Sequence, residues 1–342
     1  MAVERRIALT IDDGISGLTF GGDNNQLLFS SWDSRLRLFD VQRNQLTADF
    51  TFYSPLLCCC KEEEGSAVCG GISKEVLLVD IGAEKSVSLG QHEDCVRCVE
   101  YWKEGRLIIS GSWDQKIKSW DRRSETRKNV WSVDMKDKVY CMDVRGNACV
   151  VGLADGRVLG YDLRNMGTFL YSSISPLKYQ TRCIRIFPNC EGFALAGIEG
   201  RVAMEYFGQD DEQQSKKYTF KCHREQRGGV DYVYTINTVE FHPIYGTFAS
   251  GGCDGVVNIW DGEKRKRLTQ FPKYETSISS LSFNGDGTLL AIAASYTWES
   301  GDEDHPADSI YVRTISDSDV RPKGMAATSA PIPQTQVKIE QT

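Results

Sequence analysis

The stretch Leu107-Ile-Ile-Ser-Gly-Ser-Trp-Asp-Gln-Lys-Ile-Lys-Ser-Trp-Asp121 decides the fold, because versions of it recur along the chain at a nearly fixed step. Asp114, in the turn between its two hydrophobic halves, marks each repeat. Successive markers lie 40, 41, 41, 44 and 55 positions apart, and the repeat ends seven positions after each marker. The marker and end residues are Asp33 and Asp40, Ser73 and Asp80, Asp114 and Asp121, Asp155 and Asp162, Glu199 and Tyr206, and Asp254 and Asp261.

A period of roughly 40 residues that ends in Trp-Asp is typical of a four-stranded propeller blade. One blade cannot bury both of its faces, so blades stack around an axis. A seventh unit runs from Ser277 to Ile315. We therefore predict an all-β, seven-bladed β-propeller over residues 1–323, closed by an N-terminal strand within Arg5 to Thr10. Residues 324–342 are rich in Ala, Pro, Thr and Gln, and we expect them to be a disordered tail.

Composition excludes several classes of function. The 342 residues are 41% hydrophobic and carry a net charge of -7, which argues against general binding to nucleic acid or to a membrane surface. No apolar run approaches the roughly 18 residues that a membrane helix needs. The start, Met1 to Arg6, lacks the apolar segment of a secretory signal, so we expect a reducing compartment and no disulfides among the twelve cysteines.

Neither a metal site nor a cofactor is expected. Cys95-Val-Arg-Cys98 has metal-like spacing, but residues three apart in a predicted strand point to opposite faces. Cys58-Cys59-Cys60 reads as core packing between blades. The acidic loop Trp298 to Pro306 does not match a calcium-binding loop, and we interpret it as a solvated insertion.

We expect no catalytic residues. The most complete repeat places His92, Ser110 (or Ser112), Asp114 and Trp120 where they can form a buried hydrogen-bonded set, so His92 is interpreted as structural. No phosphate-binding loop, dinucleotide fingerprint, zinc-protease motif or nucleophile elbow is present. The sequence therefore indicates a binding platform and not an enzyme.

Two features mark the predicted rim that carries the marker turns. Trp32 and Trp113 each precede a marker aspartate, which suggests an aromatic groove for a partner; packing between neighbouring turns is the alternative. The second feature is a group of cations expected on adjacent blades, which suits carboxylates or a phosphate. These cations are Arg182, Arg201, Lys221 and Arg224. Intramolecular salt bridges to Glu199 or Glu205 are the alternative interpretation.

Two segments fall outside the repeat. The step of 55 residues before Asp254 predicts an insertion from Phe207 to Val233. In the tail, Val337-Lys-Ile-Glu340 fits the pattern of a SUMO acceptor site at Lys338, although so short a motif often matches by chance.

The chain resembles the spindle-checkpoint WD-repeat adaptors, the "budding uninhibited by benzimidazoles" propeller family, from Asp12 to Lys323. The matching stretches include Ser31-Trp-Asp, Val96-Arg-Cys-Val-Glu-Tyr101, Tyr161-Asp-Leu-Arg-Asn-Met-Gly167, Leu177-Lys-Tyr-Gln-Thr-Arg-Cys183, Ile198-Glu-Gly-Arg-Val-Ala-Met-Glu-Tyr206, Phe220-Lys-Cys-His-Arg224 and Arg321-Pro-Lys323. The second repeat matches least well.

The resemblance implies a WD40 propeller without enzymatic activity that recruits checkpoint proteins to unattached kinetochores. It implies binding to GLEBS motifs of the checkpoint kinase and its kinase-like relative, with Trp32 and Trp113 against the peptide and Arg182 and Arg224 on its glutamates. It further implies that Arg201 and Lys221 hold the phosphothreonine of phosphorylated MELT repeats in the outer-kinetochore scaffold. The expected location is the nucleus and, in mitosis, the kinetochore, with a cytoplasmic pool also compatible.

Two other functions stay open at this point. A sister family, the nuclear-pore-associated mRNA-export propellers, shares the Lys-Tyr-Gln-Thr-Arg and Lys-Cys-His-Arg stretches. The third interpretation is a generic WD40 scaffold in a ubiquitin-ligase or chromatin complex. For the checkpoint family, any contact with ubiquitin is expected to be indirect, through the partner machinery. Direct binding to nucleic acid or a membrane is not expected for any of the three.

Overall fold

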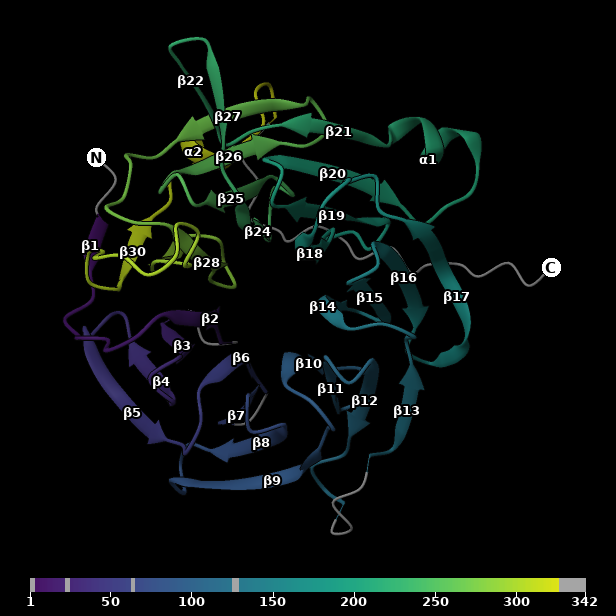
Figure 1. Cartoon of the computed structure of the whole chain (residues 1–342), viewed down its shortest axis with the longest axis vertical. Coiled ribbons are helices and arrows are strands. Elements are labelled where there is room, and N and C mark those ends of the chain that lie inside the picture. Colours follow the sequence, from purple (N-terminus) through teal and green to yellow (C-terminus); the bar gives the residue numbers. More distant parts are fainter. Residues whose placement is uncertain (1–3, 22–24, 63–64, 125–128, 326–342) are drawn as a thin grey trace.

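Seven four-stranded antiparallel sheets stand as blades around a common axis in the computed structural model (Figure 1). The innermost strands of the seven sheets line a central channel. The structure describes residues 4–21, 25–62, 65–124 and 129–325. The predicted all-β, seven-bladed propeller is confirmed. Apart from Gly324 and Met325, the predicted tail lies outside the described residues, and so does Lys338.

Each blade runs from an inner strand at the channel to an outer strand at the circumference. The inner strands are β2 (Ile15–Phe20), β6 (Leu56–Lys61), β10 (Val96–Trp102), β14 (Val139–Arg145), β18 (Thr181–Ile186), β24 (Ile236–Phe241) and β28 (Ile278–Phe283). The second strands are β3 (Gln26–Ser31), β7 (Ser66–Gly71), β11 (Leu107–Ser112), β15 (Ala148–Leu153), β19 (Gly192–Gly197), β25 (Phe248–Gly252) and β29 (Leu289–Ala294). The third strands are β4 (Arg35–Asp40), β8 (Glu75–Asp80), β12 (Lys116–Trp120), β16 (Arg157–Asp162), β20 (Arg201–Tyr206), β26 (Val257–Asp261) and β30 (Ser309–Thr314). The outer strands are β5 (Gln45–Thr51), β9 (Lys85–Gln91), β13 (Trp131–Asp134), β17 (Asn165–Ile174), β21 (Tyr218–Lys221), β27 (Lys266–Gln270) and β1 (Glu4–Arg6).

The core consists of wedges between consecutive blades. Second strands such as β7, β15 and β19 are buried along their whole length because both of their faces are covered, so their sequences are continuously small or apolar. Each apolar cluster joins residues of two neighbouring blades, as where Ile109 and Ile117 of the third blade meet Val139 and Met142 of the fourth. Every blade therefore depends on its two neighbours for burial.

The marker residues shape the turn between second and third strands. In most blades the marker side chain accepts the backbone N–H two residues later, as Asp114 does from Lys116 at 3.0 Å. The intervening residue adopts a positive φ, for example 69° at Gln115 and 71° at Gly255. Ser73 makes the same contact with Glu75 at 3.4 Å, which explains how the second blade forms without an aspartate. Short polar side chains suit this position because they can fold back onto the next N–H groups.

The N-terminal strand is shorter than predicted. β1 spans Glu4–Arg6 and not Arg5 to Thr10, and it pairs with β30 as the outer strand of the seventh blade, with Glu4 opposite Arg313. That this pairing is what closes the ring stays a prediction.

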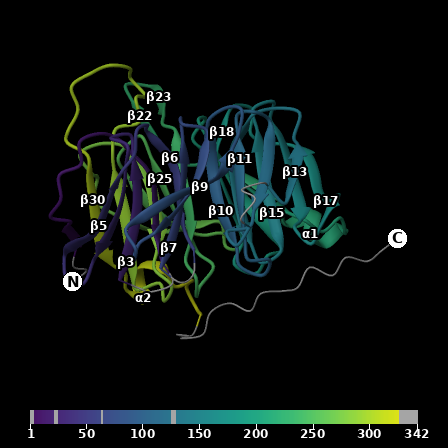
Figure 2. The ribbon, with the colours of Figure 1, turned by 90° about the horizontal axis from the view of Figure 1, so that it is seen from below.

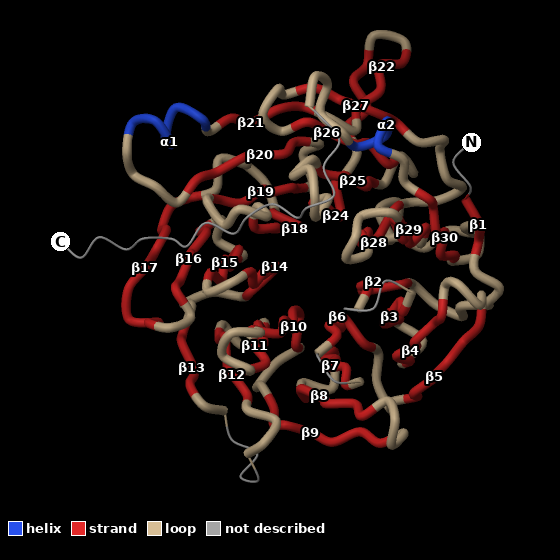
Figure 3. Tube along the Cα trace, turned by 180° about the vertical axis from the view of Figure 1, so that it is seen from behind, coloured by secondary structure: helices blue, strands red, loops and turns tan. Residues whose placement is uncertain are grey.

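The predicted insertion from Phe207 to Val233 is wrong in part, because it contains β21, the outer strand of the fifth blade. The true additions are the short helix α1 (Asp211–Lys216) and a hairpin formed by β22 (Arg224–Arg227) and β23 (Val230–Val233). The hairpin projects beyond the ring (Figure 1, Figure 3). A second helix, α2 (Asp317–Val320), contacts β26 and β27.

The third blade contains the predicted polar set, and Ser110 is the serine it uses. His92 contacts Asp114 through Nδ1 at 2.8 Å and Ser110 through Nε2 at 2.8 Å, while Trp120 Nε1 donates to Ser110 Oγ at 2.7 Å. Burial lowers the pKa of His92 and so keeps its imidazole neutral. Burial also opposes ionisation of Asp114, but hydrogen bonds from His92 and Glu93 outweigh it and hold that pKa at about 2.

A second set of the same kind was missed in the sequence. His223 contacts Asp254 and Ser250, each at 2.8 Å, and Trp260 Nε1 donates to Ser250 Oγ at 2.8 Å. The separation between histidine and aspartate is 31 residues in this blade and 22 in the third. The hairpin accounts for the longer separation and hid the match.

Replacing Ser110 by alanine should lower the free energy of unfolding by about 2–4 kcal/mol. The change leaves His92 Nε2 and the Trp120 indole N–H in the core without the hydrogen-bond partner that both share. Urea unfolding followed by circular dichroism measures this change. The control is exposed Ser172→Ala on β17, which should stay within about 0.5 kcal/mol of wild type. Equal stability of the two variants would contradict the role assigned to Ser110.

Candidate partner-binding site

We call the top face the side that carries the marker turns and the connections from each outer strand into the next blade. Figure 2 shows that the β22–β23 hairpin and the connection before β30 lie on this side, whereas α2 lies on the opposite side. Large exposed hydrophobic residues gather in these turns and connections. They include Trp32, Tyr53, Ile72, Tyr179, Ile198 and Trp298.

A ring of equivalent residues, one before each marker position, surrounds the mouth of the channel on the top face. In every blade the backbone N–H of this residue donates to a carbonyl of the preceding connection at 2.8–3.1 Å. The rim residues are Trp32, Ile72, Trp113, Ala154, Ile198, Cys253 and Ser295. Because the backbone contact is repeated, only the side chains distinguish one blade's rim position from another's.

Trp32 and Trp113 occupy different environments in this ring. The Trp32 side chain is 43% exposed, whereas Trp113 is half-buried and the ammonium of Lys138 lies 5.9 Å from its ring centroid. The buried Nε1 of Trp113 has no hydrogen-bond acceptor in the described part of the chain. Ile72, which sequence reasoning missed, is 39% exposed in the blade between them. The rim over the first three blades is therefore continuously apolar. Trp113 is partly covered by its neighbours, whereas Trp32 is largely open to solvent.

Arg201 and Lys221 are brought together. They are direct cross-strand partners at the ends of β20 and β21, so two cations stand opposite one another on one face of the fifth blade. Like charges in this arrangement repel unless an anion joins them. Glu199 offers little, since its carboxylate lies 3.9 Å from Arg201 Nε. Glu205 is buried and pairs instead with Lys217 at 3.0 Å.

Arg224 lies beside the same marker turn. Its Nη2 donates to the carbonyl oxygen of Glu199 at 2.7 Å, which fixes the guanidinium at the base of the hairpin. The Glu199 side chain departs from the usual marker contact and accepts the backbone N–H of Lys178 at 2.9 Å. The marker turn of the fifth blade is thus surrounded by three cations, Arg201, Lys221 and Arg224.

Arg182 does not join them, because it lies on the wall of the channel. Every inner strand has a β-bulge at its second residue, which turns that side chain into the channel. The bulge residues are Ser16, Leu57, Arg97, Tyr140, Arg182, Asn237 and Ser279, and all of them line a cavity of about 120 Å³. Burial, followed by the charge of Arg97, lowers the pKa of Arg182. No carboxylate belongs to this ring of bulge residues, so the upper channel is positive.

The bulge also corrects the argument made for Cys95 and Cys98, because it breaks the alternation at Arg97 on which that argument depended. Cys98 packs in the core between the third and fourth blades, and burial raises its thiol pKa to about 11. No group of three or more His, Cys, Asp or Glu side chains in the described ranges is placed to hold a metal ion.

Charges of the opposite sign lie deeper in the channel. Three residues after the bulge positions come Glu100, Asp143, Arg185 and Glu240, from four consecutive blades. Arg185 Nε donates to Glu240 at 2.9 Å, and its Nη1 lies 3.8 Å from Asp143. The Arg185 guanidinium thus lies beside two of the carboxyl groups, and its charge and that of Arg145 also act on Glu100. Burial and then the charge of Asp143 raise the pKa of Glu100 to about 8.

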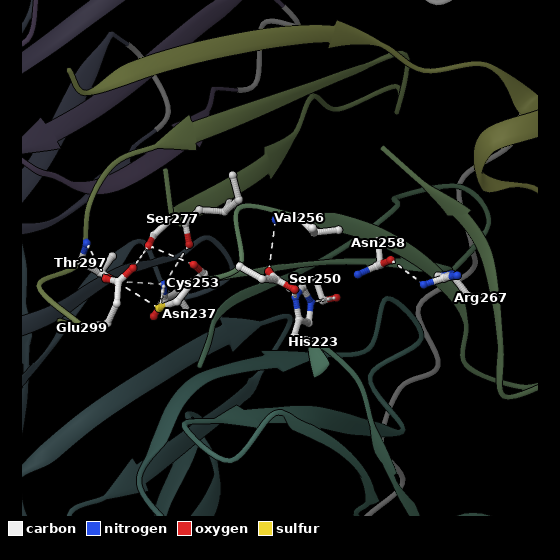
Figure 4. Close-up of polar contacts among 12 residues, drawn as sticks. His223, Asn237, Ser250, Cys253, Val256, Asn258, Arg267, Ser277, Thr297 and Glu299 are labelled. Atoms are coloured by element: carbon white, nitrogen blue, oxygen red, sulfur yellow. Dashed lines mark hydrogen bonds and ion pairs between the residues drawn. The ribbon is translucent and has the colours of Figure 1, made fainter. Parts of the chain in front are cut away.

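A side-chain network supports the rim on the other side of the mouth (Figure 4). Asn237 Nδ2 donates to the carbonyl of Ile278 at 3.0 Å and contacts Cys253 Sγ at 3.4 Å. Thr297 lies 3.3 Å from the same sulfur and donates to Glu299 at 2.8 Å. Burial raises the pKa of the Cys253 thiol, which therefore stays protonated. These contacts tie the acidic loop to the sixth blade.

The raised pKa of Glu100 predicts a pH-dependent stability. The folded protein keeps this proton up to about pH 8, whereas the unfolded chain releases it near the ordinary value of about 4.5. Stability therefore falls as pH rises between these values, by at most about 1.4 kcal/mol per pH unit. Glu100→Gln should remove that decline, so the variant gains stability over wild type as pH rises.

Urea unfolding at pH 5, 6, 7 and 8 measures this difference, with exposed Glu104→Gln in the turn after β10 as the control. A constant difference between Glu100→Gln and wild type across the four pH values would show that Glu100 is ionised throughout.

Comparison with known proteins identifies the class of propeller to which the fold belongs. The model for "WD domain, G-beta repeat" matches residues 84–121 and 214–261, which hold the two histidine-centred polar sets. The WD40 repeats of RRP9 give a TM-score of 0.77 with 16% identity over 91% of this chain and 97% of that chain, which shows the fold alone. The protein is a WD40 β-propeller. Among the described residues, no helix has the length and apolar character to span a membrane.

Full-length relatives give the family. The chain is 46% identical to mitotic checkpoint protein BUB3.1 of Arabidopsis thaliana, over 93% of this chain and 95% of the relative. It is 45% identical to mitotic checkpoint protein bub3 of Dictyostelium discoideum, over 90% and 94%. The mRNA export factor GLE2 of Chaetomium thermophilum is 34% identical over 87% and 85%. The chain belongs to the Bub3 family of mitotic checkpoint WD40 proteins.

Proposed function

We propose that the protein is a non-enzymatic adaptor of the spindle assembly checkpoint. Its top face would bind GLEBS motifs of the checkpoint kinase and its kinase-like relative, together with phosphorylated MELT repeats of the outer-kinetochore scaffold. It would act in the nucleus and at unattached kinetochores. The observation that carries the proposal is the cross-strand pair Arg201 and Lys221, which has no strong carboxylate partner within the described chain.

A phosphothreonine fits this pair for a simple electrostatic reason. Arg201 and Lys221 stand opposite each other, and the nearest carboxylate, on Glu199, lies at 3.9 Å from Arg201. A phosphate carries close to two negative charges at neutral pH and offers three acceptor oxygens. It would neutralise both cations at once and remove their mutual repulsion.

The apolar rim supports the GLEBS part of the proposal. Trp32 and Ile72 expose large side chains beside the half-buried Trp113. Arg224 and Arg182 flank the channel mouth from the fifth blade, one at the marker turn and one inside the wall. An extended peptide with apolar anchors and glutamates could place its anchors on the apolar rim. Its glutamates would then reach Arg224 and Arg182 farther along.

The mRNA-export function is the second candidate, supported by the similarity to the fungal export factor. Identity to the checkpoint relatives runs from 35% to 46%, against 34% for the export factor. Co-purification from mitotically arrested cells decides between them. Checkpoint kinases among the partners support the proposal, whereas a nucleoporin in their place supports the export function.

A phosphorylated MELT peptide should bind wild type much more tightly than its unphosphorylated twin, and Lys221→Glu should abolish the difference, since it places a like charge against the phosphate. Calorimetry measures both affinities, and the phosphate-dependent part should weaken with added salt. Lys216→Glu is the matched control, because this exposed lysine on α1 already pairs with Glu212. Equal affinities of the two peptides for wild type would exclude the assigned role.

Trp32→Ala should weaken binding of a GLEBS peptide by about thirtyfold, corresponding to about 2 kcal/mol, while the melting temperature stays unchanged. Trp113→Ala should weaken binding too, but its half-buried ring means that it also lowers stability. Phe169→Ala on β17 removes an exposed aromatic side chain away from the rim and serves as the control. Wild-type affinity of the Trp32 variant would reject the apolar rim as the peptide site.

A further inference from the structure

A second cavity lies outside the channel, between the hairpin and the sixth blade. Its volume is about 210 Å³. The hairpin supplies one wall, and the marker turn of the sixth blade, β26, β27 and the connection after β27 supply the others. The residues that line it are His223, Arg224, Glu225, Tyr234, Asp254, Val256, Asn258, Arg267, Gln270 and Lys273.

The wall of this cavity carries an excess of positive charge. Arg224, Arg267 and Lys273 come from three separate segments, and none of them forms an ion pair with a carboxylate of the described chain. Two carboxylates also belong to the wall, and each has a closer partner, although the charge of Lys273 also acts on Glu225. Glu225 pairs with Arg227 at 2.5 Å, and Asp254 contacts the His223 ring at 2.8 Å.

A buried polar side chain contributes to the same wall. Asn258 is 3% exposed, and its Oδ1 accepts a hydrogen bond from Arg267 Nη1 at 3.4 Å (Figure 4). That contact engages the amide oxygen, so the NH₂ group remains as a donor. His223 cannot serve in this way, because its two ring nitrogens are already bound to Asp254 and Ser250. The Asn258 amide therefore adds one neutral hydrogen-bond donor to the three cations.

The hairpin adds an apolar surface beside the cavity. Glu225 is the cross-strand partner of Tyr232, and Arg227 is the partner of Val230, so these four side chains share one face of the ribbon. Tyr232 is 45% exposed and Val230 57% exposed, and the Arg227 guanidinium lies 5.3 Å from the Tyr232 ring centroid. A peptide segment that reaches the cavity would find apolar contact next to it.

We propose that this cavity binds a phosphorylated side chain of an extended partner segment, separately from Arg201 and Lys221. A phosphate monoester carries close to two negative charges and several acceptor oxygens, which matches three cations and an amide donor better than a single carboxylate does. The residues next to the phosphate pack on Tyr232 and Val230. Only Arg224 is shared with the GLEBS site proposed above, so Arg267 and Lys273 separate the two sites experimentally.

The test uses the full chain carrying Arg201→Gln and Lys221→Gln, so that phosphate bound at the proposed MELT site does not contribute. Inorganic phosphate is titrated first, followed by a degenerate peptide library with a central phosphothreonine and the same library without the phosphate. Calorimetry gives the affinities. Adding Arg267→Gln and Lys273→Gln should weaken the phosphorylated library at least tenfold and lower its salt dependence.

The matched control replaces the neighbouring cations by Arg265→Gln and Lys266→Gln, which remove the same charge but do not line the cavity. This control should leave binding unchanged. All variants should unfold in one cooperative transition and keep the wild-type affinity for the GLEBS peptide. The proposal is overturned if both double variants lose binding equally, which would indicate general surface charge. It is also overturned if the phosphorylated library binds no better than inorganic phosphate, which would leave no role for a partner segment.

Discussion

The need to bury both faces of every sheet governs this molecule. Each second strand is covered on both sides, and each apolar cluster is shared by two neighbouring blades, so that no blade completes its own core. The strands and the turns of each repeat are therefore under different constraints. The strands are constrained by packing, whereas the turns and connections at their ends are not. Residues that are not needed for burial are therefore concentrated at the edges of the blades.

The top face shows how a chain with net negative charge can still gather cations locally. The fifth-blade turn gathers Arg201, Lys221 and Arg224, and the upper channel adds Arg97 and Arg182. The carboxylates that could neutralise them are held elsewhere: Glu205 by Lys217, and Asp143 and Glu240 around Arg185 lower in the channel. The two signs are therefore separated along the channel. Any anion that binds the solvent-exposed cations of the rim would do so with an affinity that depends on salt.

The repeat made the architecture predictable. A buried four-stranded unit gives the sequence a regular period and a Trp-Asp ending in several repeats. The His92 set could be named in advance since its spacing is undisturbed. The His223 set could not, because nine extra residues of hairpin separate its histidine from Asp254. The placement of Arg182 was hidden for a different reason. A bulge at the second residue of each inner strand changes which side chains face the channel, and no residue type marks that bulge in the sequence.

The contact between β1 and β30 joins residues that lie at opposite ends of the chain, with Glu4 opposite Arg313. During synthesis the first strand emerges from the ribosome long before its partner exists. The seventh blade must therefore be the last to acquire all four strands, after the other six have been made. Closing so long a loop is entropically costly, and contacts at such separation form slowly. Until the seventh blade is made, the apolar side chains of the first blade that pack against it stay uncovered, and exposed apolar surface of this kind favours aggregation.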